Sequence, residues 1–314
     1  MKGSFYLKKT IKTQIGSDTI NRNIWEVRKM ETLTIGDVRV TWLNGGDNHL
    51  DGGAMFGVVP KELWSKKYPP AYDNRIPMRT DPLLVQIGKE VVLIDAGIGN
   101  GMIEGKQKKH FGITEESHVE TDLMKLGLTR HDVTKVAMTH MHFDHVSGLT
   151  TKSQGTLEST FPNAVIYVSE VEWNEMQNPN IRSKNTYWKQ NWEAIESQVV
   201  PFHDSIQLLP EFTMHHTGGH SDGHSVVVIS SRGEQLVHMG DLLPTHAHHN
   251  VLWVMAYDDF PMTSISQKEK WLQYAYNQNA WLSFYHDAYY RAIKWDTKGD
   301  IINAVKFNQS LLSQ

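Results

Sequence analysis

Histidine and aspartate side chains crowd one short stretch of the sequence, Thr139–His145. Within it stand His140, His142, Asp144 and His145, in the pattern HxHxDH. Imidazole nitrogens and carboxylate oxygens are groups with which proteins hold Zn²⁺ and similar divalent ions. A single histidine is often satisfied by hydrogen bonds inside a core, but four ligands at this spacing indicate a metal site. The pattern therefore predicts a metal-dependent hydrolase.

A short apolar run, Lys135–Met138, comes directly before this cluster and is typical of a buried strand. Because successive side chains of a strand alternate, His140 and His142 should leave it on the same side. Asp144 and His145 then lie beyond the bend. One loop could thus serve two cations, with the two strand histidines on one ion and the Asp–His pair on the other.

Three later motifs offer the ligands that a two-metal site still needs. His220 lies in the glycine turn TGGHSDGH, Asp241 in HMGD and His286 in FYHD. Each follows an apolar run or a glycine turn, which is where a ligand-bearing loop is expected to leave a strand.

The order of these motifs resembles that of the metallo-β-lactamase superfamily, over residues 34 to about 296. Around the ligands, Asp51–Pro60 and Asp241–His246 are similar to the quorum-quenching N-acyl homoserine lactonases of the YtnP type. The resemblance implies an α+β fold, the αββα sandwich, with two packed sheets covered by helices. The metal site would lie on loops at one edge of the sheets.

The resemblance also implies a complete ligand set. One ion would be held by His140, His142 and His220 and the second by Asp144, His145 and His286, with Asp241 and a hydroxide bridging the two. Two divalent ions per chain are expected, zinc first, with manganese, iron or cobalt as alternatives, because the chain has no cysteine. The hydroxide would attack a lactone carbonyl, and Asp144 or a metal-bound water would protonate the leaving ring oxygen. Asp144 and Asp241 are therefore the expected catalytic residues.

Asp95 ends another apolar run and could accept a hydrogen bond from the distal nitrogen of a metal-binding histidine. The glycines that follow, Gly97–Gly101, invite comparison with a dinucleotide-binding loop. They lack the GxGxxG spacing and the acidic residue expected after such a loop, so no nucleotide cofactor is predicted.

The substrate side is less well marked. Related lactonases often place a tyrosine three residues after the bridging aspartate, where this chain has Pro244. Candidate replacements are Tyr257, Tyr285, His246, His248 and His249. The three histidines could face the substrate or support the ligands, or be ordinary surface residues.

Acyl-chain contacts are expected from apolar residues near the motifs. The candidates for substrate binding are Met55, Phe56, Trp253, Tyr257 and His246. The alternative for each aromatic residue is plain core packing.

The ligands are spread from residue 140 to residue 286, and no Pro-, Gly- or Ser-rich linker divides the 314 residues. One catalytic domain over residues 30–314 is therefore expected. Residues 1–29 carry seven Lys or Arg against two acidic residues and lack the apolar core of a secretory signal. They are interpreted as a basic accessory or flexible segment, with a non-native leader, an upstream start or a docking arm as alternatives.

The coarse pattern combines strands and helices. Strands are expected at 38–42, 83–87, 91–94, 164–168, 225–229 and 235–238, with a hairpin turn at 88–90. Helices are expected at 169–177, 185–197 and 266–279, and one more is capped by Thr114 and stopped by Gly127.

The net charge of −4 offers no general attraction for nucleic acid, and no apolar run approaches the length that spans a bilayer. A soluble cytoplasmic protein without nucleic-acid or membrane partners is the default expectation, and a homodimer is left open. The favoured function is hydrolysis of N-acyl homoserine lactones, with an organophosphate triesterase or other ester hydrolase as the alternative. A β-lactamase, a nuclease and a metal-binding protein without catalytic activity fit the pattern less well.

Overall fold

Two seven-stranded sheets lie face to face in a computed structural model that describes residues 30–307. The predicted basic segment 1–29 lies outside the described residues. The first sheet has the order β1 (Thr32–Ile35), β2 (Val38–Trp42), β5 (Leu83–Ile87), β6 (Glu90–Ile94), β7 (Lys135–Ala137), β10 (Val165–Ser169), β11 (Val199–Phe202). The second has the order β12 (Ser205–Leu209), β13 (Phe212–His216), β14 (Ser225–Ser231), β15 (Glu234–His238), β16 (Trp281–Ser283), β17 (Tyr290–Trp295), β18 (Ile301–Lys306).

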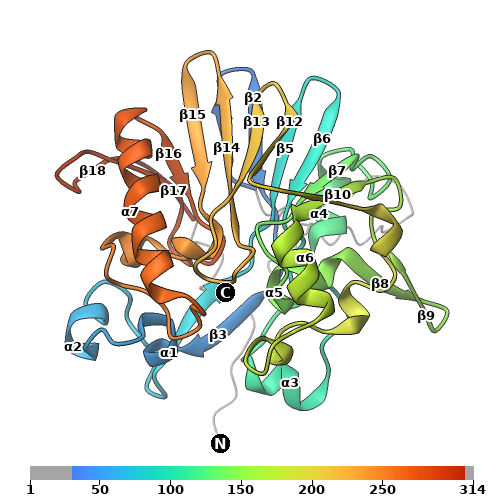
Figure 1. The fold of residues 1–314 in the computed structure, drawn as a ribbon, viewed down its shortest axis with the longest axis horizontal. Coiled ribbons are helices and arrows are strands. Elements are labelled where there is room, and N and C mark those ends of the chain that lie inside the picture. The colour runs from blue at the N-terminus through green and yellow to red at the C-terminus, as the bar shows by residue number, and fades with distance from the viewer. Residues whose placement is uncertain (1–29, 308–314) are drawn as a thin grey trace, which may run out of the picture.

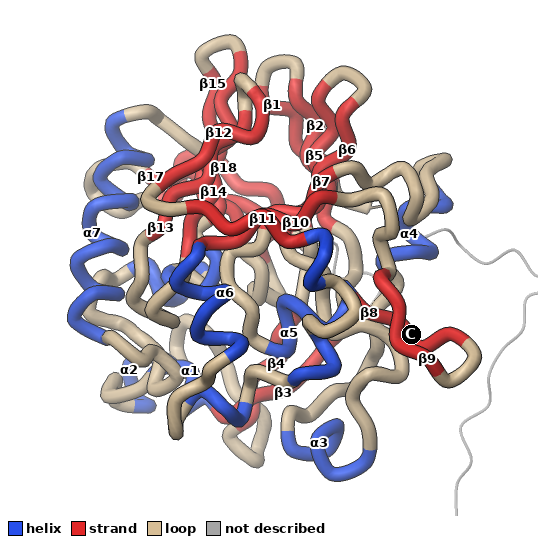
Figure 2. Tube along the Cα trace, turned by 45° about the vertical axis from the view of Figure 1, so that its right-hand side comes forward, coloured by secondary structure: helices blue, strands red, loops and turns tan. Residues whose placement is uncertain are grey.

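Helices cover the outer faces of both sheets (Figure 1). The first sheet carries α4 (Val119–Lys125) and α6 (Glu170–Gln177), and the second carries α7 (Pro261–Asn277). This arrangement confirms the expected αββα sandwich. Figure 2 shows the strands gathered in the middle layers with helices outside them.

Most of the remaining elements lie at the lower side of the sheets in Figure 1, where the loops that carry the predicted ligands leave the strands. They are β3 (Asp47–Asp51), α1 (Gly52–Phe56), α2 (Lys61–Trp64), β4 (Arg75–Arg79), α3 (Gly105–His110), α5 (Phe143–Val146), β8 (Thr150–Ser153) and β9 (Thr156–Ser159). None of the helices in the described part of the chain is long and apolar enough to cross a membrane.

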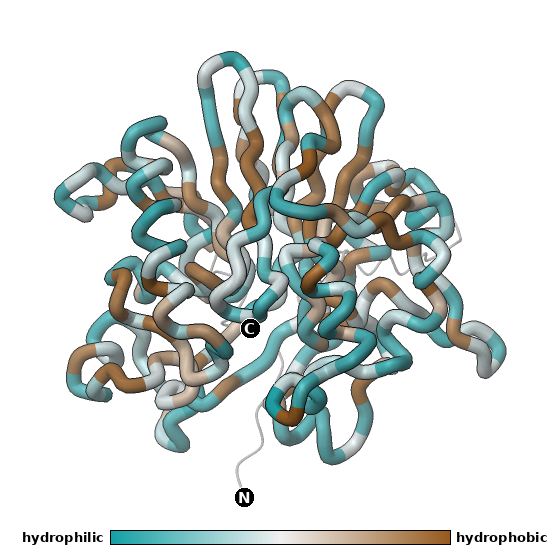
Figure 3. The backbone as a smooth tube through the Cα atoms, in the orientation of Figure 1, coloured by the Kyte–Doolittle hydropathy of each residue, from teal (hydrophilic) through white to brown (hydrophobic). Residues whose placement is uncertain are grey.

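The main core lies between the sheets, where alternating apolar residues of both inner faces meet. Val40, Val85 and Ile94 of the first sheet and Met214 and Ile229 of the second are all buried there. Figure 3 shows the same hydrophobic runs along the strands. Burial of such side chains stabilises the fold by roughly 1.5–3 kcal/mol each.

Strand directions bring the loops that carry the predicted ligands to one edge. β15 and β16 run parallel, and β14, which lies beside β15, is antiparallel to it and to β13. The loops after β13, β15 and β16 therefore leave the second sheet on the same side. A backbone bond from Ser225 to Thr139 (2.8 Å) joins this edge to the loop after β7 of the first sheet.

The helix expected at 266–279 begins earlier, at Pro261, and ends at Asn277. Two other helix predictions were wrong in extent. The helix expected from Thr114 begins only at Val119, because the backbone N–H groups of Thr114 and Glu115 bind the backbone oxygen of Asp47 instead. Residues 185–197 form short 3₁₀ turns rather than one helix. Tyr187 in this stretch bonds to Glu172, so tertiary contacts override the helical pattern.

Candidate metal centre

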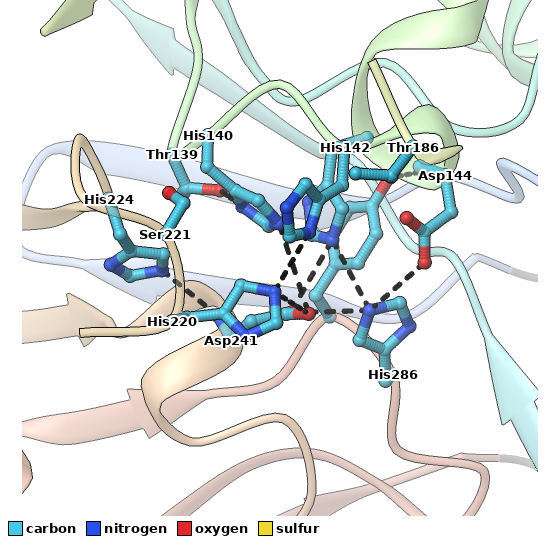
Figure 4. Close-up of polar contacts among 12 residues, drawn as sticks. Thr139, His140, His142, Asp144, Thr186, His220, Ser221, His224, Asp241 and His286 are labelled. Carbon is cyan, nitrogen blue, oxygen red and sulfur yellow. Dashed lines mark hydrogen bonds and ion pairs between the residues drawn. The ribbon is translucent and has the colours of Figure 1, made fainter. Parts of the chain in front are cut away.

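The seven predicted ligands converge at the edge of the sandwich (Figure 4). Within each of three groups the ligand atoms lie within 4.8 Å of one another: His140, His142 and His220; His140, His145 and Asp241; and Asp144, His145 and His286. The loop after β7 and the short helix α5 supply His140, His142, Asp144 and His145. The other three come from the loops after β13, β15 and β16.

Asp241 lies between the two histidine sets, with one carboxylate oxygen toward each. Its Oδ2 atom lies 3.4 Å from Nε2 of His220, and its Oδ1 atom lies 3.2 Å from Nε2 of His286 and 3.4 Å from that of His145. Burial by itself would raise the pKa of Asp241, but these three histidines hold that pKa well below its ordinary value. The carboxylate is therefore ionised and placed to bridge two cations.

His145 and His286 bring together two ring nitrogens that cannot hydrogen-bond to each other as neutral rings. The Nδ1–H of His145 donates to Asp95 (2.9 Å), and that of His286 donates to the backbone oxygen of Arg79 (2.7 Å). Each neutral ring then presents only a lone pair at Nε2, and the two Nε2 atoms lie 3.3 Å apart. Burial opposes the charged form of His145, yet Asp241 and Asp95 raise its pKa well above the ordinary value. The space around the Nε2 atoms of His145 and His286 therefore favours positive charge, which a bound cation would supply.

A buried chain of hydrogen bonds orients His140 in the same sense. Thr139 donates from its N–H and its hydroxyl to the two oxygens of Asp95, both at 2.8 Å. With that proton committed, the Thr139 hydroxyl accepts the Nδ1–H of His140 (3.1 Å). The Nε2 atom of His140 is left buried and without a hydrogen-bond partner among the described residues. Because an unpaired buried acceptor is costly, this donor set fits a divalent cation.

Asp258 orients His220 and was not anticipated from the sequence. Its Oδ1 atom accepts the Nδ1–H of His220 at 2.9 Å, which turns the Nε2 lone pair toward His142 and Asp241. The only sequence feature at this place is the pair Asp258 and Asp259 after Tyr257. No rule of sequence spacing connects Asp258 with a histidine 38 positions earlier.

His224, also unassigned from the sequence, holds the backbone of the bridging aspartate. Its Nε2 atom accepts the N–H of Asp241 at 3.1 Å. The preceding Gly240 has φ +50°, and a Cβ there would lie 2.7 Å from the same nitrogen. Glycine is therefore required before Asp241, which explains the GD pair of this motif.

A cavity of about 960 Å³ opens beside these ligands. Five of the seven line it: His142, Asp144, His220, Asp241 and His286. Its apolar wall consists of Leu50, Met55, Met78, Phe111, Phe143, Trp188, Met255 and Tyr257. Polar side chains include Asp51, Arg75, Lys106, His110, Arg182 and Asp259. An apolar cavity with a few converging polar groups is the usual form of a small-molecule site.

The family model of the metallo-beta-lactamase superfamily matches residues 76–286, which is more than half of the chain. The chain belongs to the metallo-β-lactamase superfamily. Members of this superfamily bind divalent metals, and the clustered histidines and aspartates of this chain are suited to hold them. A solved structure from Staphylococcus aureus, a probable metal-dependent hydrolase, is 46% identical, with a TM-score of 0.85 over 88% of this chain and 99% of that chain.

More distant relatives are lactonases. An N-acyl homoserine lactonase from a Bacillus species is 29% identical over 155 residues, which are 48% of this chain and 54% of the relative. The chain thus spans about half the length of the curated relatives it matches. The structure of AidC, a dizinc quorum-quenching lactonase, shares the fold, with a TM-score of 0.74, 21% identity and coverage of 89% of this chain and 97% of that chain.

Two of the five predicted substrate contacts, Met55 and Tyr257, line the cavity, and the other three do not. Phe56 is fully buried between the rings of Trp64 and His248, with centroids 4.9 and 4.4 Å away. Trp253 packs edge-on against Phe56. His246 is held by the carboxylate of Asp287 at 2.6 Å. These side chains pack behind the cavity wall, so the acyl-contact prediction needs correction for them.

Tyr285 and His249 were also candidates to replace the tyrosine that related lactonases have at the position of Pro244. Both side chains are hydrogen-bonded within the protein. Tyr285 is buried, donates its hydroxyl hydrogen to the backbone of Asp144 and accepts the N–H of Gly97. His249 bonds to the Tyr276 hydroxyl at 2.6 Å. Of the aromatic wall, Phe111, Phe143 and Trp188 had no recognisable signal in the sequence, since nothing marks an aromatic residue near a ligand as facing a cavity.

His248 makes stability depend on pH. It is fully buried, its Nε2–H donates to the backbone of Met55 (2.8 Å), and burial lowers its pKa to about 3. Below pH 6.5 His248 is protonated in the unfolded chain but stays neutral in the folded chain. The free energy of unfolding therefore falls as the pH drops from 6.5 toward 3. At pH 5 this costs about 2 kcal/mol. Urea unfolding at pH 7 and pH 5 measures the decrease in the free energy of unfolding between the two pH values. In His248→Gln this decrease should be smaller than in the wild type by roughly that amount.

His110→Gln, at an exposed position, serves as the control for this measurement and should keep the wild-type loss. If His248→Gln loses as much stability between pH 7 and pH 5 as the wild type, His248 is not the source of the acid sensitivity.

Proposed function

We propose that this hydrolase opens the lactone ring of N-acyl homoserine lactones. The observation that supports this most is the placement of the ligand cluster beside a large cavity with an apolar, aromatic wall. Such a cavity suits a small polar ring carrying an acyl chain. The similarity to proteins named N-acyl homoserine lactonase points in the same direction.

We further propose that the chain holds two divalent ions, zinc first. His140, His142 and His220 would hold one, and Asp144, His145 and His286 the other, with Asp241 between them. Bound cations would lower the pKa of water toward neutrality and polarise the ester carbonyl, so no serine or cysteine nucleophile is needed.

Asp144 is proposed to accept the proton that the attacking O–H group releases and to pass it to the leaving ring oxygen. Its carboxylate lines the cavity, and its Oδ2 atom lies 3.5 Å from Nε2 of His286. A carboxyl group at the boundary between ligands and cavity can contact the scissile bond directly, which general acid catalysis requires.

Three stacked rings form the proposed acyl-binding wall. The centroids of Phe111 and Phe143 lie 4.1 Å apart, and those of Phe143 and Trp188 lie 5.2 Å apart. Because Phe143 directly follows the ligand His142, this wall begins beside the metal cluster and leads away from it. An apolar chain attached to a ring at the cluster would lie against it.

Tyr257 is the proposed donor to the lactone carbonyl, since Pro244 stands where related lactonases have a tyrosine. It lines the cavity and makes no hydrogen bond within the described residues. Its hydroxyl is protonated at neutral pH, since the ordinary pKa of a tyrosine is about 10 and partial burial raises this pKa further. We expect Tyr257→Phe to lower kcat/KM about tenfold, by loss of one donor in the transition state. Steady-state kinetics with parallel metal analysis checks this.

The matched control is Tyr72→Phe, which removes a hydroxyl at a fully exposed position and should change nothing. Unaltered kinetics in Tyr257→Phe would remove this residue from the mechanism while leaving the metal site unaffected.

The proposed function is tested by ring opening of a panel of N-acyl homoserine lactones by metal-loaded protein, followed as acid release. Chelator-treated protein is the blank. Chelator-sensitive turnover of lactones with several acyl lengths would support the lactonase proposal, and the relative rates would show which acyl length the cavity prefers. No turnover on any lactone by protein with metals bound would contradict it, and the same protein would then be assayed on phosphotriesters and linear esters.

A further inference from the structure

Glu172 is a fully buried carboxylate that the metal chemistry does not use. It lies in the first turn of α6, with none of its surface exposed. Its Oε1 atom accepts the backbone N–H of Met141 and the hydroxyl of Tyr187, both at 2.7 Å, and its Oε2 atom accepts the hydroxyl of Ser221 at 2.6 Å. Hydrogen bonds to a carboxylate are stronger than those between neutral groups.

These donors belong to three segments around one half of the metal centre. Met141 stands between His140 and His142, and Ser221 directly follows His220. These three histidines form one of the three groups whose ligand atoms lie within 4.8 Å of one another. One side chain on α6 thus connects the backbone segments that carry all three.

Tyr187 extends the same connection to the cavity. Its ring lies against that of His142, with centroids 5.3 Å apart. Its neighbours Thr186 and Trp188 line the cavity wall. Glu172 therefore joins the three-histidine group to the wall beside it.

The first turn of α6 around Glu172 is closely packed. Ser169 caps α6 by accepting the N–H of Glu172 (3.1 Å) and donates its hydroxyl hydrogen to the backbone oxygen of Gly223 (2.5 Å). A Cβ at Gly223 would lie 2.0 Å from the backbone nitrogen of Glu172. The first turn of α6 thus lies directly against the loop that carries His220.

We propose that Glu172 is a positioning residue that holds His140, His142 and His220 in the geometry for one metal ion. Loss of its carboxylate leaves three buried donors without an acceptor, so the two ligand-bearing loops would separate. The proposal rests on these histidines as metal ligands and does not depend on the substrate being a lactone.

The test measures Zn²⁺ binding to the full chain by competition with a chromophoric chelator, together with thermal unfolding of the metal-free protein. Glu172→Ala should weaken the affinity for one of the two ions 10- to 100-fold. Glu172→Gln should stay within about threefold of the wild type, because its carbonyl oxygen keeps the bonds to Met141 and Tyr187 and the Ser221 hydroxyl can turn to accept. The visible spectrum of the Co²⁺-substituted protein should change in Glu172→Ala and be retained in Glu172→Gln.

Glu170→Gln is the matched control, since Glu170 lies in the same helical turn but pairs with His203 at the surface. It should bind Zn²⁺ as the wild type does. If Glu172→Ala does not fold, Ser221→Ala decides the question: a several-fold weaker Zn²⁺ affinity supports the proposal, and unchanged affinity overturns it. Wild-type affinity and Co²⁺ spectrum in a folded Glu172→Ala would overturn it as well. A chain that opens no lactone yet shows these binding changes would contradict the proposed function alone.

Discussion

Asp241→Ala is expected to lower kcat/KM for the hydrolysed ester by about 1,000-fold or more and to reduce the bound metal from two ions to one or none. Among the ion pairs of the described residues, Asp241 is the only carboxylate within 3.5 Å of histidines from both proposed ligand sets, at His220 on one side and His145 and His286 on the other. Its removal leaves the two proposed cations without their shared anion. Metal analysis by mass spectrometry, together with steady-state kinetics, measures both effects.

Asp222→Ala provides the matched control, because Asp222 is an exposed carboxylate in the loop that carries His220. It should retain full metal content and rate. Full metal occupancy with full activity in Asp241→Ala would refute the bridging site altogether.

Metal removal is expected to abolish activity and to lower the melting temperature by about 10 °C or more. Without cations, the buried Nε2 atoms of His145 and His286 face each other at 3.3 Å, and Nε2 of His140 has no hydrogen-bond partner among the described residues. An ion present at 1,000 times its Kd stabilises the folded state by about 4 kcal/mol. In a domain of this size each kcal/mol corresponds to roughly 2–4 °C.

Differential scanning calorimetry of loaded and chelator-treated protein measures this change, and added Zn²⁺ should restore both the melting temperature and the rate. The Asp241→Ala protein serves as the internal reference, since chelator should shift its melting temperature much less. Equal melting temperatures for loaded and metal-free wild type would mean that no ion is bound in the folded state.

Local patterns account for the parts of the fold and site that could be predicted. The alternation in Val38–Trp42 and the hairpin of Leu83–Ile94 gave strands at those places. The HxHxDH spacing placed four ligands in one loop. Each of these patterns spans a few residues, over which backbone geometry alone decides which side chains face the same way.

Predictions failed where a distant partner overrides the local pattern. The stretch 185–197 has helical character, yet Tyr187 is bound by Glu172 and Trp188 stacks on Phe143, and the chain forms separate turns. Phe56, the last residue of α1, was predicted to contact the substrate because it is apolar and near the motifs, but the rings of His248 and Trp64 enclose it.

By itself the sequence determined the resemblance to the family, because motif order and spacing are properties of the chain as written, and through that resemblance it predicted the sandwich and the set of candidate ligands. Only the tertiary structure decided how those ligands are oriented. Asp95, Asp258 and Glu172 bind residues of the segments that carry the candidate ligands, 31 to 50 positions away, through hydrogen bonds of 2.6–2.9 Å. Such contacts arise from the packing of two sheets and their helices, and no local pattern encodes the distance between two atoms on different loops.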